Sequence, residues 1–98
     1  MGEFTISHAE SDGRGRYSAR VDGFVGEAEL TYMRRGPDLV VAHHTFAPPS
    51  MRGTGVALAL VKQLIADART QGFKILPTCS YIAVQAKRHP EWADVISQ

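Results

Sequence analysis

The N-terminal part of the chain alternates between apolar and polar residues, which is the pattern of half-buried β-strands. Residues 3–9 alternate over a short span and predict an edge strand. Residues 11–15 are rich in glycine and charge and predict a loop, after which the alternation resumes in residues 16–21. The residues expected to share one face of this second strand are Tyr17, Ala19 and Val21.

The alternation then continues into a third and a fourth predicted strand. An Asp22–Gly23 pair suits a two-residue hairpin whose central residues need positive φ, so residues 24–33 are expected to form the third strand. Residues 39–46 begin with apolar side chains on both faces, as in a strand covered on both sides. The first half of the chain therefore predicts an antiparallel meander.

The second half of the chain changes to helical periodicity. Apolar residues recur three and four positions apart, and polar residues fill the opposite face, so residues 56–71 predict an amphipathic helix of roughly four turns. Gly72 stands where a left-handed residue would end this helix. The apolar positions of the helix are Ala57, Leu60, Val61, Leu64, Ile65 and Ala68.

A short strand and a second helix are expected after the long helix. Residues 73–76 are apolar and are stopped by Pro77, residues 80–88 suit a helix that ends before Pro90, and residues 92–96 suit a last helical turn. A strand, a helix and a strand in this order usually pair the two strands in parallel. We therefore expect a mixed α/β sheet with a cleft where its two parallel strands diverge.

Composition narrows the class of protein. A chain of 98 residues predicts a single domain spanning residues 1–98 with one modest core. Eleven basic and ten acidic residues leave a net charge of +1, so no global field favours nucleic acid or a membrane surface. Cys79 is the sole cysteine, and no run of about 18 apolar residues is present, so we expect a cytoplasmic protein without a disulfide.

The segment from residue 44 to residue 57 carries the richest chemistry. A predicted strand enters a loop with two prolines and two glycines, and this loop opens the long helix. The first turn of a helix leaves N–H groups unpaired, and glycine lets such a backbone approach an anion closely. With the Arg52 guanidinium, these groups would suit a pyrophosphate. Alternatively, Gly53 and Gly55 serve only to form a tight turn.

Two common phosphate-binding motifs do not fit this loop. No Gly-Lys-Ser/Thr follows the glycines, which excludes the P-loop of nucleotide triphosphatases. Leu58 occupies the third glycine position of the dinucleotide-binding fingerprint.

Residues 52–57, Arg-Gly-Thr-Gly-Val-Ala, resemble the R/Q-x-x-G-x-G/A signature of the GCN5-related N-acetyltransferases, although Ser50 occupies the leading Arg/Gln position. The resemblance implies an acyl-CoA N-acyltransferase fold, in which this loop holds the pyrophosphate of acetyl-CoA and the preceding strand hydrogen-bonds the pantetheine arm. The cofactor-binding positions implied are Thr45, Phe46, Ala47, Ser50, Arg52, Gly53, Thr54, Gly55, Val56 and Ala57.

Further landmarks are similar to a subgroup of very small acetyltransferase-like proteins, over residues 16–96. They are His44-Thr45, the Arg-Gly-x-Gly loop, Pro77-Thr78-Cys79-Ser80-Tyr81 and His89-Pro90. The resemblance implies a truncated domain without the elements that larger acetyltransferases use to enclose an acceptor. Some relatives carry a glutamate at the position of Phe46, so a carboxylate base is missing there.

Three side chains are candidates for acetyl transfer. Cys79 precedes a predicted helix, whose dipole would lower the thiol pKa, so the thiol could act as a nucleophile or as an acid; alternatively it only fills space. Tyr81 could donate its hydroxyl to the leaving sulfur or anchor the second helix. His44, at the end of the predicted central strand, is the candidate base, or else a structural histidine.

The surroundings of these side chains complete the expectations for the site. Backbone N–H groups of residues 45–47 could stabilise an oxyanion. Strand alternation places His43 on the face opposite His44. The four histidines and the cysteine show no metal-ligand spacing, so no metal site is expected.

The sequence thus predicts an acetyl-CoA-dependent N-acetyltransferase that acts on a small amine or a protein lysine, as a monomer or homodimer. A non-catalytic acyl-CoA-binding module and a small interaction protein with an empty site are the alternatives.

Overall fold

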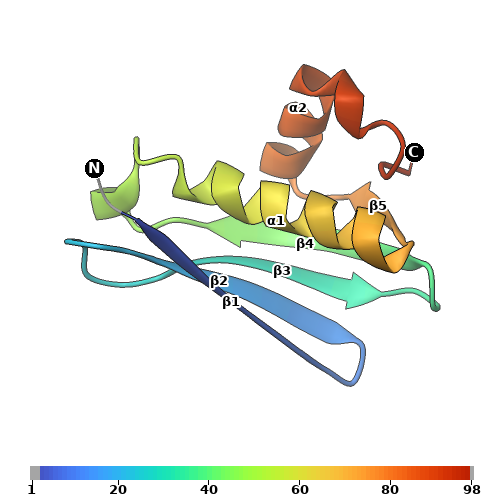
Figure 1. The fold of residues 1–98 in the computed structure, drawn as a ribbon, viewed down its shortest axis with the longest axis horizontal. Coiled ribbons are helices and arrows are strands. Elements are labelled where there is room, and N and C mark those ends of the chain that lie inside the picture. The colour runs from blue at the N-terminus through green and yellow to red at the C-terminus, as the bar shows by residue number, and fades with distance from the viewer. Residues whose placement is uncertain (1–2, 98) are drawn as a thin grey trace.

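The computed structural model describes residues 3–97, in which five strands form one sheet in chain order (Figure 1). Strands β1 to β4 pair antiparallel, and β4 pairs with β5 in parallel. This confirms the predicted α/β class with a mixed, mainly antiparallel sheet. The elements are β1 (Phe4–Ser11), β2 (Arg14–Val21), β3 (Ala28–Arg34), β4 (Leu39–Phe46), η1 (Pro49–Met51), α1 (Val56–Gln71), β5 (Lys74–Pro77), α2 (Ser80–Arg88) and η2 (Pro90–Trp92).

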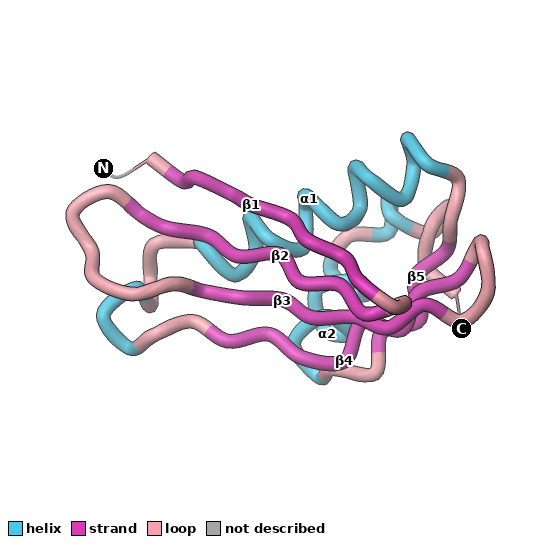
Figure 2. Tube along the Cα trace, turned by 90° about the horizontal axis from the view of Figure 1, so that it is seen from below, coloured by secondary structure: helices cyan, strands magenta, loops and turns pink. Residues whose placement is uncertain are grey.

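Helix α1 lies on one side of β1–β3, and no helix covers the other side of these three strands (Figures 1 and 2). Helix α1 packs on β1, β2 and β3, while α2 contacts β4 and β5. Alternate strand residues therefore face either the helical layer, which we call the inner face, or the uncovered outer face. The buried inner-face residues of the three central strands include Tyr17, Ala19, Val21, Ala28, Leu30, Tyr32, Val40 and Ala42.

The turn between β1 and β2 is shorter than expected. Asp12 and Gly13 have φ of +53° and +76°, and the strands are paired from Ser11 and Arg14 outward. This is the geometry of a two-residue hairpin whose two central residues need positive φ. Pairing therefore begins at the turn itself, and the predicted loop of residues 11–15 is wrong.

The predicted hairpin at Asp22–Gly23 and the predicted start of β3 at residue 24 are also wrong. The chain makes a turn in which the Phe24 N–H donates to the Val21 carbonyl at 3.0 Å, and β3 begins only at Ala28. Val25 is 90% exposed, and Gly26 has φ of +100°. The apparent alternation after Gly23 thus belongs to an exposed connection rather than to a strand.

The two α-helices follow the prediction closely. Helix α1 spans Val56–Gln71 and ends at Gly72, whose φ is +82°. Helix α2 spans Ser80–Arg88, as predicted from the residues before Pro90. The last helical turn, predicted over residues 92–96, instead lies earlier as a 3-10 helix over Pro90–Trp92, and Ile96 forms a β-bridge with Ile75. No helix within residues 3–97 is long and apolar enough to cross a membrane.

Two tyrosines fill the interface between the sheet and α1. The Tyr17 hydroxyl donates to Asp67 of α1 at 2.6 Å, and the Tyr32 hydroxyl donates to Glu10 of β1 at 2.5 Å. Burial raises the pKa of both phenols, so they stay protonated as donors. The Tyr32 ring also occupies the space beside Gly15, where a Cβ would lie 1.9 Å from its Cζ atom.

We predict that Gly15→Ala lowers the free energy of unfolding by about 1–3 kcal/mol, because the added methyl overpacks the Tyr32 ring. Urea denaturation would measure this loss. The control is Ser18→Ala on the outer face of the same strand, which should change stability by less than about 0.5 kcal/mol. Equal midpoints for the two variants would contradict the packing argument.

Candidate functional site

Strands β4 and β5 separate where β5 ends. Their last pair is Ala42 with Pro77, which lacks an N–H and so cannot continue the ladder. The N–H groups of Thr78 and Cys79 both converge on the Ala42 carbonyl, at 3.0 and 3.2 Å. The chain then enters α2, while β4 continues to Phe46. We call this divergence, formed by residues 42–46 and 77–80, the fork; it matches the predicted position.

Cys79 lies inside the fork, immediately before α2. Its Sγ is 3.4 Å from the Thr45 Oγ1 of β4, and the side chain is half-buried against the core. Burial alone would raise the thiol pKa. The hydrogen bonds of the Thr45 hydroxyl and of the Ile82, Tyr81 and Thr45 backbones outweigh it and lower the pKa of Cys79 below its ordinary value. The surroundings therefore favour a thiolate.

Tyr81 lies in the first turn of α2, two residues after Cys79. Burial raises the pKa of its hydroxyl, which the nearby Arg88 partly offsets, so the phenol remains protonated near neutral pH. The side chain is partly buried and packs against the core. Its chemistry thus suits a proton donor, while its packing also fits an anchoring role for α2.

A β-bulge in β4 decides where the two histidines point. Thr31 pairs with His44 and Tyr32 with Ala42, so His43 is an extra residue without a partner in β3. His43 Nδ1 lies 3.4 Å from the Thr31 hydroxyl, and His44 Nε2 lies 3.2 Å from Glu29. Both partners are outer-face residues of β3, so both histidines point outward. The prediction of opposite faces is wrong, because a bulge breaks strand alternation.

Glu29 links His44 to a fixed positive charge. The Arg16 Nε donates to Glu29 at 2.8 Å, and this guanidinium holds the pKa of Glu29 below its ordinary value. A proton on the Nε2 of His44 suits the contact with the anionic Glu29 and leaves Nδ1 with a lone pair. His44 is therefore an exposed, oriented imidazole on the outer side of the fork.

The glycine loop before α1 is built by its backbone. Gly53 and Gly55 have φ of +86° and +83°, a conformation that other residues rarely adopt, and nothing lies within 4 Å of a Cβ placed at either position. The Thr54 hydroxyl donates to the Met51 carbonyl at 2.6 Å and accepts the Val56 N–H at 3.2 Å. The loop thus caps one helix donor itself and leaves open space in front of its glycines.

The remaining donors of this loop allow a test of whether a diphosphate fits. Among residues 3–97, no acceptor pairs with the N–H groups of Gly53, Gly55, Ala57 or Leu58. Arg52 is exposed and makes no ion pair with any of these residues. Unpaired amides at a helix N-terminus beside a free guanidinium suit a doubly charged group. The loop therefore fits a diphosphate through its glycine amides, whereas the N–H groups of Arg52, Thr54 and Val56 already have acceptors within the loop.

The structure brings some predicted residues together and separates others. Thr45 meets Cys79 in the fork, and the glycine loop follows β4 directly, so both lie toward the carboxyl end of that strand. His44 lies on the outer face instead, with the exposed Phe46 on the same side. Ala47 is partly buried against the core, and Ser50 is exposed.

Two contributors were missed in the sequence. Glu29 orients His44, and the Thr45 hydroxyl faces the Cys79 thiol. Glu29 occupies an outward position in the alternation of residues 24–33, but only the pairing of β3 with the bulged β4 assigns it to His44. The sequence predicted a role only for the backbone of Thr45. Its hydroxyl was missed because only the tertiary structure brings the start of α2 close to β4.

The chain thus forms a mixed sheet with a β-α-β crossover, a fork beside its parallel pair, and a glycine loop at the helix N-terminus whose amides lack acceptors among residues 3–97. A family model described as GCN5-related N-acetyl-transferase matches residues 16–95. The chain belongs to this family.

The chain is also similar to two proteins of known sequence and, in its fold, to one solved structure. The chain is 32% identical to Protein NATD1 of Mus musculus over 77 residues, which are 79% of the chain and 70% of the relative. It is 33% identical to Protein NATD1 of Homo sapiens over 77 residues, which cover 79% and 68% of the two chains. The solution NMR structure of a GCN5-like protein from Staphylococcus aureus shares the fold, with a TM-score of 0.63 and 20% identity over 93% of this chain and 87% of that one.

We predict that Cys79 is alkylated by iodoacetamide with a pH midpoint below that of the denatured protein. A lowered thiol pKa shifts the appearance of thiolate, the reactive form, to lower pH. Thr45→Val removes a donor to the sulfur and should move the midpoint up, whereas Thr45→Ser should keep it low. Alkylation rates measured from about pH 5 to about pH 10 test this. Coincident profiles for the native and denatured protein would contradict it.

Proposed function

We propose that the protein is an acetyl-CoA-dependent N-acetyltransferase that transfers the acetyl group to a primary amine. The observation that carries this proposal lies at the carboxyl end of β4. There Thr45 contacts the Cys79 thiol, whose pKa is lowered, and the chain continues through η1 into a loop whose glycine amides lack acceptors among residues 3–97. The family supplies the general reaction, acetyl transfer. The cofactor and the roles of individual residues rest on the fit of the side chains and amides described above.

The glycine loop would bind the diphosphate of acetyl-CoA. The amides of Gly53, Gly55 and Ala57 have no acceptor within residues 3–97, and the first turn of α1 adds the positive end of its dipole. Arg52 would add a charge-assisted contact to a phosphate oxygen. Acetyl-CoA, when bound, supplies an activated acetyl group as a thioester. The pantetheine arm would follow the unpaired half of β4 into the fork.

Cys79 and Tyr81 offer two routes for the transfer itself. In the first, the Cys79 thiolate attacks the thioester carbonyl, the carbon–sulfur bond to CoA breaks, and Tyr81 protonates the departing thiolate; an amine then attacks acetyl-Cys79. In the second, the amine attacks the thioester directly, and the Cys79 thiol protonates the leaving sulfur. In both routes a neutral amine and acetyl-CoA yield an amide and free CoA thiol.

His44 would act on the acceptor side of this reaction. In the neutral imidazole with its Nε2 proton directed at Glu29, Nδ1 has a lone pair on the outer side of the fork that could remove a proton from the attacking amine. The backbone amides of residues 45–47 are candidates for holding the oxyanion that develops on the acetyl oxygen.

A non-catalytic acyl-CoA-binding module is the competing function. The exposed outer face and the short chain would also suit a protein that binds acyl-CoA without transferring its acyl group. The contact of Cys79 with Thr45 and the lowered pKa of its thiol support the enzyme, because groups with shifted pKa values cluster at catalytic sites.

We predict that acetyl-CoA at about 100 times its Kd stabilises the protein against unfolding by about 2.7 kcal/mol. Gly55→Ala should weaken this binding about tenfold, since a Cβ strains the left-handed residue that presents the loop amides. A thermal shift titration measures both effects. Gly36→Ala is the matched control, because Gly36 also has φ of +83° and open surroundings but lies in the β3–β4 turn. Equal weakening by both variants would argue against a loop-bound diphosphate.

We predict that Cys79→Ala keeps the CoA affinity and loses acetyl transfer by at least about a hundredfold. The release of free CoA thiol in the presence of an amine measures the transfer. Acetylation of Cys79, detected by mass after incubation with acetyl-CoA, distinguishes the nucleophile from the acid. Full activity of Cys79→Ala would assign the thiol to packing, and a wild-type protein that binds CoA without turnover would support the binding module.

A further inference from the structure

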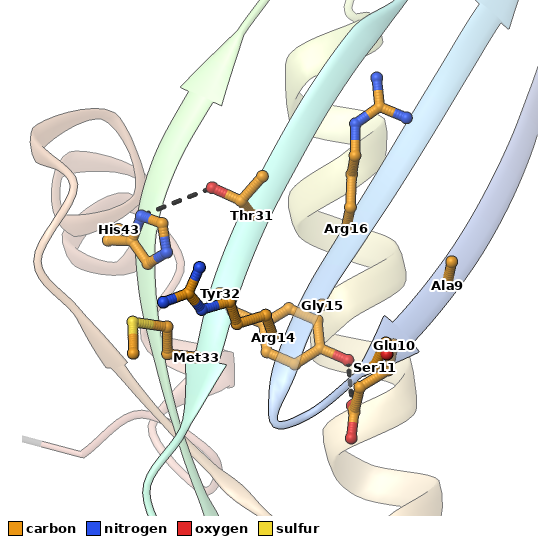
Figure 3. A pocket seen from close by; sticks show the side chains of 10 residues that line it. All are labelled: Ala9, Glu10, Ser11, Arg14, Gly15, Arg16, Thr31, Tyr32, Met33 and His43. Carbon is orange, nitrogen blue, oxygen red and sulfur yellow. Dashed lines mark hydrogen bonds between the residues drawn. The ribbon is translucent and has the colours of Figure 1, made fainter.

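The outer face of the sheet contains a groove of about 540 Å³ that is not part of the cofactor site (Figure 3). It crosses β1 to β4, and its floor includes the backbone of Gly15 and Tyr32, whose side-chain positions face inward. Its rim is formed by the outward side chains of Arg14, Thr31, Met33 and His43, among others. Pockets of this volume accommodate small molecules rather than folded partners.

Arg14 provides this groove with an uncompensated positive charge. Neighbouring strands lie about 4.8 Å apart, so β2 is roughly 10 Å from β4, and Figure 3 shows the Arg14 side chain reaching across β3 toward His43 and Met33. No ion pair to Arg14 exists among residues 3–97, whereas Arg16 on the same strand is paired with Glu27 and Glu29.

The acidic residue of the groove does not neutralise this charge. Glu10 contributes to the lining, but its carboxylate accepts the Tyr32 hydroxyl and the Arg34 Nε, at 2.5 and 2.8 Å. Both oxygens of the Glu10 carboxylate are thus occupied by Tyr32, an inner-face residue, and by Arg34. The guanidinium of Arg14 is therefore the charged group available to a ligand in the groove.

The opposite end of the groove meets the fork. His43 lines the groove and is the bulged residue of β4, directly after Ala42. The Ala42 carbonyl accepts the N–H of Cys79, so the groove ends beside the strand that separates it from the thiol. A ligand held by Arg14 would thus extend toward the point where the acetyl group is proposed to lie.

We propose that this groove binds the acetyl acceptor, and that the acceptor is a small primary amine carrying a carboxylate. The inference rests on the proposed acetyl transfer. Arg14 binds the carboxylate as a charge-assisted pair, and the amine reaches the fork beside His43. The amine nitrogen forms a bond to the acetyl carbon, the bond from that carbon to sulfur breaks, and the proton lost by nitrogen is balanced by the one gained by the CoA thiolate.

The experiment compares acceptors that differ only in the carboxylate. Rates of CoA thiol release are measured for 4-aminobutanoate against butylamine and for phenylalanine against phenethylamine, with the amines compared at equal concentrations of their neutral form. The wild type should prefer the carboxylate member of a pair by about tenfold to a hundredfold in kcat/KM. Arg14→Gln should abolish the preference, and Arg14→Lys should retain part of it.

The control variant is Arg20→Gln, an exposed outer-face arginine of the same strand that does not line the groove. It should keep the wild-type preference, and thermal unfolding verifies that all variants are folded. A wild type without preference, or a preference unaffected by Arg14→Gln, would overturn the proposal. So would a lysine peptide that is acetylated far better than either small carboxylate.

A binding measurement separates this inference from the proposed function. Butanoate, which has no amine, is titrated into the protein without acetyl-CoA while the NMR signals of Thr31, Met33 and His43 are followed. Shifts of these signals that vanish in Arg14→Gln support the groove even if no acetyl transfer is found. Absence of any shift in the wild type would overturn the carboxylate site, whatever the result of the acetyl-CoA titration.

Discussion

The backbone carbonyl of Ala42 is the contact on which the site depends. It accepts the N–H groups of both Thr78 and Cys79 at the point where Pro77 ends the parallel ladder. This shared acceptor fixes the angle at which the chain leaves the sheet, and so places the start of α2 beside the free half of β4. This contact brings Cys79 next to Thr45, although 34 positions separate the two residues in the chain.

The chemistry of the fork relies on backbone dipoles more than on charged side chains. The Cys79 thiol is surrounded by hydrogen-bonding groups of Thr45, Tyr81 and Ile82, and the glycine loop presents amides without partners in the described residues. Such donors are fixed by the secondary structure and need no side-chain ordering when a ligand binds. In the proposed reaction, a small domain with a net charge of +1 would therefore use backbone groups to stabilise both a thiolate at Cys79 and a bound anion.

The sequence predicted those elements whose pattern is local. The bounds of α1 and α2 follow from helical periodicity, Gly72 and Pro90. Strand β4 was predicted at its observed bounds because residues 39–46 begin with apolar side chains on both faces. The errors arose where geometry between strands decides. The connection before β3 has the alternating pattern of a strand, so β3 was predicted to begin too early. The bulge at His43 depends on the pairing of β4 with β3 and could not be inferred from one strand alone. For the same reason Glu29 was not connected with His44.

The bulge also explains how so short a chain could serve two substrates. Thr45 pairs with the inner-face residue Leu30, so the Cys79 thiol approaches β4 from the helical side, whereas His43 and His44 point to the uncovered side. Strand β4 therefore has surfaces of different character on its two sides, and both sides border the fork. In the proposed reaction, acetyl-CoA approaches from the loop and helix side and the amine from the open face. An acceptor site on the outer face needs no additional helix or strand, only residues that the sheet already exposes.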